Sequence, residues 1–213
     1  MVGILYTSIR YSNKYLEDVP VNLHFGKTLL VSLLMVGISL AAPVVIADSH
    51  EAKINQYIDS DIRGWLSSDE LIRVVDMQNI KHLGITANEI NRLDQRWRKE
   101  RLRDNGALIA SVMGNELSAF LRGIKAASGG VITEIFVMDN VGLNVGQTNG
   151  TGDFMQGDEA KWQKTYLISA GAVFIDAVEE EDGLNISQVS LTVARPNNAR
   201  LGAITIGINV DAL

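Results

Sequence analysis

The spacing of apolar residues changes at Gly129-Gly130, and this change constrains the fold more than any other feature of the sequence. Before the glycine pair, apolar residues recur every three or four positions, which is the spacing of a helix face. After it, short β-branched runs alternate with Gly, Asn and Asp, which is typical of strands and turns. The sequence therefore predicts a helical region over 48–130 and a sheet over 131–213, together forming one domain, 48–213.

Two capping boxes predict helix starts in the helical region. Ser67 is followed three positions later by Glu70, and Thr86 is followed at the same distance by Glu89. In such a pair the hydroxyl accepts a backbone N–H bond and the glutamate reaches back to the cap. We expect the helix that begins at the first box to end at Gly84.

A basic cluster follows the second box. Its members are Arg92, Arg96, Arg98, Lys99, Arg101 and Arg103. One interpretation is a surface for an anionic partner or a lipid headgroup. The other, which we favour, is a solvated helix face with ion pairs to the acidic residues interspersed among these cations.

The sheet region predicts five strands and one short helix. The strands are expected over 131–138, 143–148, 172–178, 186–194 and 201–210. The helix is expected over 158–168, with Asp158 as its N-cap, and Asp139 is expected to fix the turn after the first strand. Two strands, a helix and three strands do not form a βαβ repeat. The predicted fold class is therefore α+β, with one antiparallel sheet and helices on one side.

An apolar run over 28–47 predicts export of the rest of the chain. Lys27 precedes the run, no charge appears before Asp48, and Val45-Ile46-Ala47 resembles a signal-peptide cleavage site. A run of about 20 residues is also long enough for a membrane anchor. The predicted location is thus periplasmic or secreted, with an inner-membrane anchor facing the periplasm as the alternative. Residues 1–27 form an N-terminal extension without clear periodicity.

The composition disfavours several function classes. The chain has no cysteine, which excludes disulfides, cysteine-ligated metals and thiol nucleophiles, and its three histidines lack metal-site spacing. A formal net charge of −6 disfavours nucleic acid as a partner. The sequence contains no G-x-S-x-G, P-loop or Rossmann pattern. We therefore predict a protein that is not an enzyme, with no catalytic residue, metal or cofactor.

Three segments of the sheet region resemble a known family. Ile132–Val145 is similar to the first hairpin, Thr151–Trp162 to the central loop and helix start, and Leu201–Val210 to the closing strand of extracytoplasmic Cache domains. These are PAS-like sensor domains of the PDC type, and the chain resembles the small single-Cache proteins of proteobacteria. The resemblance implies a PAS-like five-stranded sheet crossed by a loop and helix. Phe154-Met155 stands where family members commonly have an aromatic pair.

The resemblance also implies a ligand between the sheet and the crossing loop-helix. The residues expected there are Asp153, Phe154, Gln156, Asp158, Trp162, Tyr166 and Asp176. Aromatic walls and carboxylates favour an amine or a cation, and amines, amino acids and organic acids are the ligand classes considered. The alternative roles are structural, because aromatic residues four apart share a helix face and more often form core.

The predicted function is a small-ligand-binding sensory domain outside the cytoplasm. Without an output module of its own, it would report to a separate membrane receptor or histidine kinase. The alternative is a structural or partner-binding exported module with a closed pocket. Whether the amphipathic helices form a homodimer or only cover the sheet is left open by the sequence.

Overall fold

The structure is a computed structural model that describes residues 49–103 and 106–213. The extension predicted for residues 1–27 and the export segment predicted for residues 28–47 lie outside the described residues. Within those that are described, no helix has both the length and the apolar character needed to cross a bilayer.

Helices occupy the first part of the described chain, as the apolar spacing predicted. Ile54, Ile58 and Ile62 are buried along one face, where the first helix passes through a π-helical turn without a break. The helices are α1 (Ser49–Tyr57), the π-helix η1 (Ile58–Ile62), α2 (Arg63–Leu66), α3 (Asp69–Lys81), α4 (Ala87–Arg101), α5 (Ala107–Met113) and α6 (Glu116–Ala127).

The two predicted caps have different outcomes. The capping box at Thr86 is confirmed, because the Thr86 amide donates to Glu89 Oε2 at 2.9 Å and its hydroxyl accepts from the Glu89 amide at 3.3 Å. The box that begins at Ser67 is wrong by one residue. Ser67 is the C-cap of α2, whereas Ser68 has the extended backbone of an N-cap and its hydroxyl accepts from the Leu71 amide at 3.4 Å.

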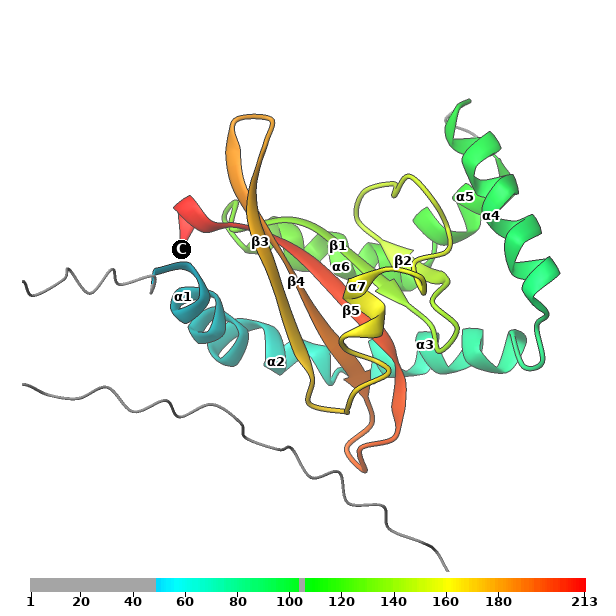
Figure 1. Ribbon diagram of the computed structural model, residues 1–213, viewed down its shortest axis with the longest axis horizontal. Coiled ribbons are helices and arrows are strands. Elements are labelled where there is room, and N and C mark those ends of the chain that lie inside the picture. The colour runs from blue at the N-terminus through cyan, green and yellow to red at the C-terminus, as the bar shows by residue number, and fades with distance from the viewer. Residues whose placement is uncertain (1–48, 104–105) are drawn as a thin grey trace, which may run out of the picture. The chain divides into compact units, whose positions relative to one another are not determined.

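The second part of the chain forms one antiparallel sheet of five strands. The strands are β1 (Ile132–Met138), β2 (Asn144–Gln147), β3 (Val173–Glu181), β4 (Leu184–Ala194) and β5 (Arg200–Asn209), followed by the short 3-10 helix η2 (Val210–Ala212). Their order is β2-β1-β5-β4-β3, which is the order of PAS-like sheets, and Figure 1 shows the long β3–β4 hairpin at one edge. The predicted fold class, α+β with a PAS-like sheet, is confirmed.

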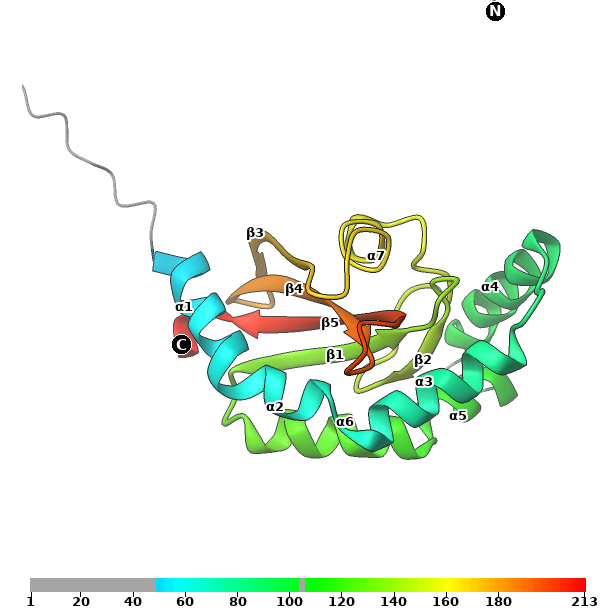
Figure 2. The same ribbon diagram turned by 90° about the horizontal axis from the view of Figure 1, so that it is seen from below.

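The two faces of the sheet are covered by different elements. Figure 2 shows α3 and α6 on one face and α7 (Ala160–Gln163) on the other. Residues alternate along β1, so that Ile135 and Val137 join the core beneath the helices. Phe136 and Met138 face the other side, where they pack with Ala203 of β5. Most of the apolar core therefore lies between the sheet and the N-terminal helices.

The crossing helix is shorter than predicted. It covers only Ala160–Gln163, its N-cap is Glu159, and Asp158 is exposed, so the prediction of Asp158 as the cap is wrong. The Thr165 hydroxyl donates to the Lys161 carbonyl at 2.6 Å. Because a threonine hydroxyl that bonds the preceding turn competes with the helical backbone ladder, the helix gives way to turns at this point.

Candidate functional site

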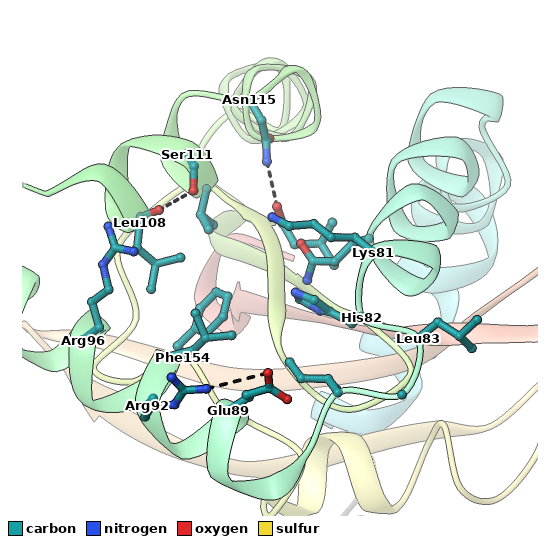
Figure 3. Close-up of a pocket in the computed structure, with 16 residues that line it drawn as sticks. Lys81, His82, Leu83, Glu89, Arg92, Arg96, Leu108, Ser111, Asn115 and Phe154 are labelled. Carbon is teal, nitrogen blue, oxygen red and sulfur yellow. Dashed lines mark hydrogen bonds and ion pairs between the residues drawn. The ribbon is translucent and has the colours of Figure 1, made fainter.

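A pocket of about 660 Å³ lies where α3, α4 and α5 meet the edge of the sheet at β2. Figure 3 shows the side chains around it. The polar and charged lining comprises Gln78, Lys81, His82, Glu89, Arg92, Arg96, Ser111 and Asn115. The apolar lining comprises Leu83, Ile85, Leu93, Leu108, Val112, Val145 and Phe154, with Gly84 in the turn between α3 and α4. Its volume is that of a site for a small organic molecule.

Helix α4 forms one wall of the pocket and is fastened to the loop after β2. Asp94 Oδ1 accepts the Phe154 amide at 2.8 Å. The Trp97 ring stacks on Phe154 with centroids 5.4 Å apart, and its indole N–H donates to the Thr151 carbonyl at 3.0 Å. Because Trp97 is fully buried, this contact fixes the floor of the pocket under α4.

The charge of Asp94 is stabilised where it holds the loop. Burial raises the pKa of Asp94, but hydrogen bonds from the Met155 amide and the Arg98 guanidinium outweigh burial and bring it below its ordinary value. The Arg98 Nε lies 2.7 Å from Asp94 Oδ2. The Asp94 carboxylate is therefore ionised at neutral pH, and it accepts hydrogen bonds from Arg98 and from the loop amides.

The charged groups of the pocket carry a positive excess. Three basic side chains line it, namely Lys81, Arg92 and Arg96, against one carboxylate, Glu89. Arg92 approaches Glu89 only to 3.7 Å, and Arg96 pairs with Glu100 at 2.6 Å. Lys81 makes no hydrogen bond or ion pair with any residue that the structure describes.

The Glu89 carboxylate is engaged by the cap of its own helix. Its Oε2 accepts from both the amide and the hydroxyl of Thr86, at 2.9 Å and 2.7 Å. These bonds lower the pKa of Glu89 below its ordinary value. One oxygen of the only pocket carboxylate among the described residues is thus already hydrogen-bonded within the helix start.

Two residues of the pocket wall share one buried carboxylate behind it. Gln78 Nε2 donates to Asp139 Oδ2 at 2.9 Å, and His82 Nδ1 lies 2.8 Å from the same oxygen. The other oxygen accepts the amides of Val141 and Leu143 at 3.0 Å and 2.8 Å. Asp139 is fully buried and holds the β1–β2 turn, which confirms its predicted role in the hairpin.

Asp139 also connects the pocket to α7. Its backbone carbonyl accepts the Trp162 indole N–H at 3.1 Å. Trp162 in turn stacks on Tyr166 with centroids 5.0 Å apart, and both pack against Phe136 and its neighbours on the sheet. A single residue therefore joins the pocket wall, the hairpin turn and the crossing helix.

The predicted site residues divide between several places, and only Phe154 lines this pocket. Asp153 and Gln156 lie in the same loop and bond to each other, and Arg98 Nη2 donates to Asp153 at 3.2 Å. Burial, followed by the nearby Glu159 carboxylate, raises the pKa of Asp153 above its ordinary value. These contacts hold the loop in place.

The remaining predicted residues lie on the α7 face of the sheet or are exposed. Trp162 and Tyr166 fill the space over the sheet where the ligand was expected. Asp158 and Asp176 are exposed, and among the described residues the Asp176 carboxylate accepts a hydrogen bond only from the amide of its neighbour Ala177. Nowhere in the described ranges do three or more metal-ligating side chains gather.

The sequence did not single out most of the residues that line the pocket. Gln78, Lys81 and His82 lie at the end of α3, and nothing local distinguishes them from solvated helix positions. The basic cluster was the one sequence feature that pointed to residues of this pocket. Arg96 and Arg98 do form the ion pairs with residues four positions away that the favoured interpretation expected, but Arg92 and Arg96 also face a pocket.

Solved structures similar to this chain include bacterial sensor domains. The E. coli DcuS sensor domain is 13% identical with a TM-score of 0.43, and the match covers 76% of this chain and 92% of that domain. The V. cholerae histidine kinase DctB sensor domain is 18% identical with a TM-score of 0.35, at 76% and 58% coverage. The ligand-binding domain of Campylobacter jejuni chemoreceptor Tlp3, in complex with 4-methylisoleucine, is 7% identical with a TM-score of 0.36, at 76% and 60% coverage.

The likeness to PAS-like folds rests on the strand order β2-β1-β5-β4-β3 of this chain's own sheet. The chain spans less than two thirds of the length of the DctB and Tlp3 domains. No protein-family model matches the sequence, and no curated protein matches it either. All three TM-scores lie below 0.5, so these matches carry no conclusion about what the chain binds or does.

Proposed function

We propose that this chain is an extracytoplasmic sensory domain that binds a small solute in the pocket between α3, α4 and α5. It acts by binding and not by catalysis, and it reports to a separate membrane receptor or histidine kinase. The observation that carries the proposal is the shared carboxylate of Asp139. Gln78 and His82 line the pocket and bond this carboxylate, while α7 bonds the same residue from the opposite face of the sheet.

A sensor needs a pocket whose occupancy changes the stability of an element elsewhere. A ligand that contacts Gln78 or His82 would change how firmly these two side chains hold Asp139. The β1–β2 turn depends on the same carboxylate through two backbone amides. Helix α7 has only four residues, so its position depends on tertiary contacts and little on helix propensity.

A thermal-shift screen of the purified full-length chain tests the proposal. The panel contains amino acids, amines, organic acids, neutral solutes and divalent cations. A solute at 100 times its Kd adds about 2.7 kcal/mol to the stability of the folded state, which raises Tm measurably. Ser111→Trp, which places an indole at the pocket wall, should abolish the shift.

Ala110→Trp is the matched control, because Ala110 is exposed on the same helix and does not line the pocket. It should leave the shift intact. If no solute of any class raises Tm, the proposed sensory function is wrong. A shift that survives Ser111→Trp would place the binding site elsewhere on the chain.

A structural or partner-binding module is the second candidate function. The observation in its favour is the packing of Trp162 and Tyr166 on Phe136, which occupies the sheet face where the ligand was expected. This function predicts that a membrane-fraction partner is captured equally well by wild type and by Ser111→Trp. Under the sensory proposal, capture changes when the pocket is blocked.

A further inference from the structure

The pocket combines a cationic side with an apolar floor. Phe154, Leu93 and Leu108 supply apolar surface inside it. Leu83, in the turn between α3 and α4, also lines it and is 88% exposed. A single exposed leucine is normal on a protein surface, so the apolar character of the pocket rests on Phe154, Leu93 and Leu108.

The cations come from two different walls. Lys81 lies at the end of α3, while Arg92 and Arg96 lie one turn apart on α4. Figure 3 shows Lys81 across the pocket from Arg96. A charged group held between these walls would meet positive charge from both sides, which attracts an anion and repels an amine.

From these observations we infer that the pocket binds an organic anion, namely a carboxylate joined to an apolar body about the size of an aromatic ring. Lys81 and Arg92 bind the carboxylate, and Phe154 and Leu93 contact the ring. The inference rests on the proposed function and adds the chemical class of its ligand. It differs from the amine that Asp153 and Asp158 had favoured, because neither residue lines the pocket.

The ionic state of the wall supports an anion. Lys81 has no partner within the described residues, and Arg92 has only the 3.7 Å contact to Glu89. Glu89 is bonded to the Thr86 amide and hydroxyl, so its charge is partly satisfied within its own helix. Two cations are thus available to a ligand without breaking a short ion pair.

The size and lining of the pocket support the apolar body. A volume of about 660 Å³ far exceeds that of an isolated carboxylate group and suits a small organic molecule. The Phe154 ring is held by its stack on Trp97, so the floor is rigid before a ligand enters. A rigid apolar floor reduces the entropy lost on binding.

Isothermal titration calorimetry on the full-length chain tests the inference with three probes of similar shape and different charge. Phenylacetate is the anion, phenylacetamide is the neutral analogue, and phenethylamine is the cation. We expect phenylacetate to bind at least 10-fold more tightly than either analogue, since a charged hydrogen bond contributes about 1.5–3 kcal/mol. Raising the salt concentration from about 0.05 M to 0.5 M should weaken its binding.

Single substitutions locate the binding site. Lys81→Gln and Arg92→Gln should each weaken phenylacetate binding by about 10-fold or more. Lys99→Gln is the matched control. It removes one positive charge from an exposed position of α4, the helix that carries Arg92, and Lys99 does not line this pocket. It should change the affinity less than 2-fold, as expected for a screened surface charge.

The outcomes separate this inference from the proposed function. If phenylacetamide or phenethylamine binds as tightly as phenylacetate and Ser111→Trp abolishes that binding, the sensory function stands and the anionic ligand class is wrong. Phenylacetate binding that is indifferent to Lys81→Gln and Arg92→Gln also overturns the inference. If none of the three probes binds, the inference is wrong, and the wider solute panel decides whether the proposed function falls with it.

Discussion

Replacing Asp139 with asparagine should destabilise the fold more than any other change of a single charge at the described acidic positions. The fully buried carboxylate accepts four hydrogen bonds, from Gln78, His82, Val141 and Leu143, at 2.8 to 3.0 Å. An asparagine of the same shape has one acceptor oxygen and turns an NH2 group towards two of the four partners. In either orientation of the asparagine amide, its NH2 group faces two N–H donors where the wild-type carboxylate oxygen accepts from them.

The magnitude follows from the groups left unpaired. A buried polar group without a partner costs about 1–3 kcal/mol, and a hydrogen bond to a charged acceptor contributes about 1.5–3 kcal/mol. Because a change of His82 tautomer recovers part of the loss, we expect a net cost of about 3 kcal/mol for Asp139→Asn. For a domain of this size, that cost lowers Tm by roughly 6–12 °C.

Urea unfolding followed by far-UV circular dichroism measures the change in the free energy of unfolding. The m-value should stay constant, which shows that the variant unfolds from the same compact state. Asp176→Asn is the matched control, because Asp176 is exposed on β3, and it should stay within about 0.5 kcal/mol of wild type. If Asp139→Asn also stays within that range, the Asp139 carboxylate is not the shared acceptor that joins the pocket wall to the β1–β2 turn.

Further predictions concern the loop, the helix anchor and a sheet carboxyl. Gly142 has a φ of +85°, and a Cβ there would lie 2.3 Å from the Gly157 Cα. Gly142→Ala should therefore lower the free energy of unfolding in urea by more than about 1 kcal/mol. Gly123→Ala is the control and should not destabilise the fold, because a Cβ at that position meets open space. Trp97→Ala should cost about 3–5 kcal/mol, because it removes a fully buried ring from the contact that holds α4, and a cost below about 1 kcal/mol would contradict that role. Burial raises the pKa of Glu134 more than the Gln188 hydrogen bond lowers it, so its contribution to stability is full below its unfolded pKa and declines as pH rises through the folded pKa. Glu134→Gln should therefore gain stability relative to wild type between about pH 4 and pH 7, and an unchanged difference between the two proteins at both pH values would refute this.

The elements of the fold could be predicted from local sequence because local rules decide them. The four-residue spacing of Ile54, Ile58 and Ile62 specifies a buried helix face, and the Thr86 capping box specifies where α4 begins. The five strands follow from β-branched runs separated by turns, and Gly129 and Gly130 both have the positive φ that glycine permits. Errors occurred at ends, as at Ser68 and Glu159, where one residue more or less changes the local energy little.

The residues of the candidate site could not be predicted from local sequence patterns. Its lining extends from Gln78 to Phe154 and comes from three helices, a turn, a strand and a loop. The central contact joins His82 to Asp139, which lie 57 positions apart. Neither residue lies in a sequence motif from which the contact could be predicted. The sequence did determine that Asp139 holds a turn, because an aspartate caps nearby amides through a short side chain.

The sequence by itself determined the helix and strand content, the α+β class and most element positions, because these depend on spacing and propensity within a few residues. Only the tertiary structure decided that Trp162 and Tyr166 pack on the sheet and that Phe154 stacks on Trp97. Which aromatic residue becomes core and which becomes the floor of a pocket depends on long-range packing. That packing places the cations of α3 and α4 around one cavity, and their spacing in the chain does not reveal it.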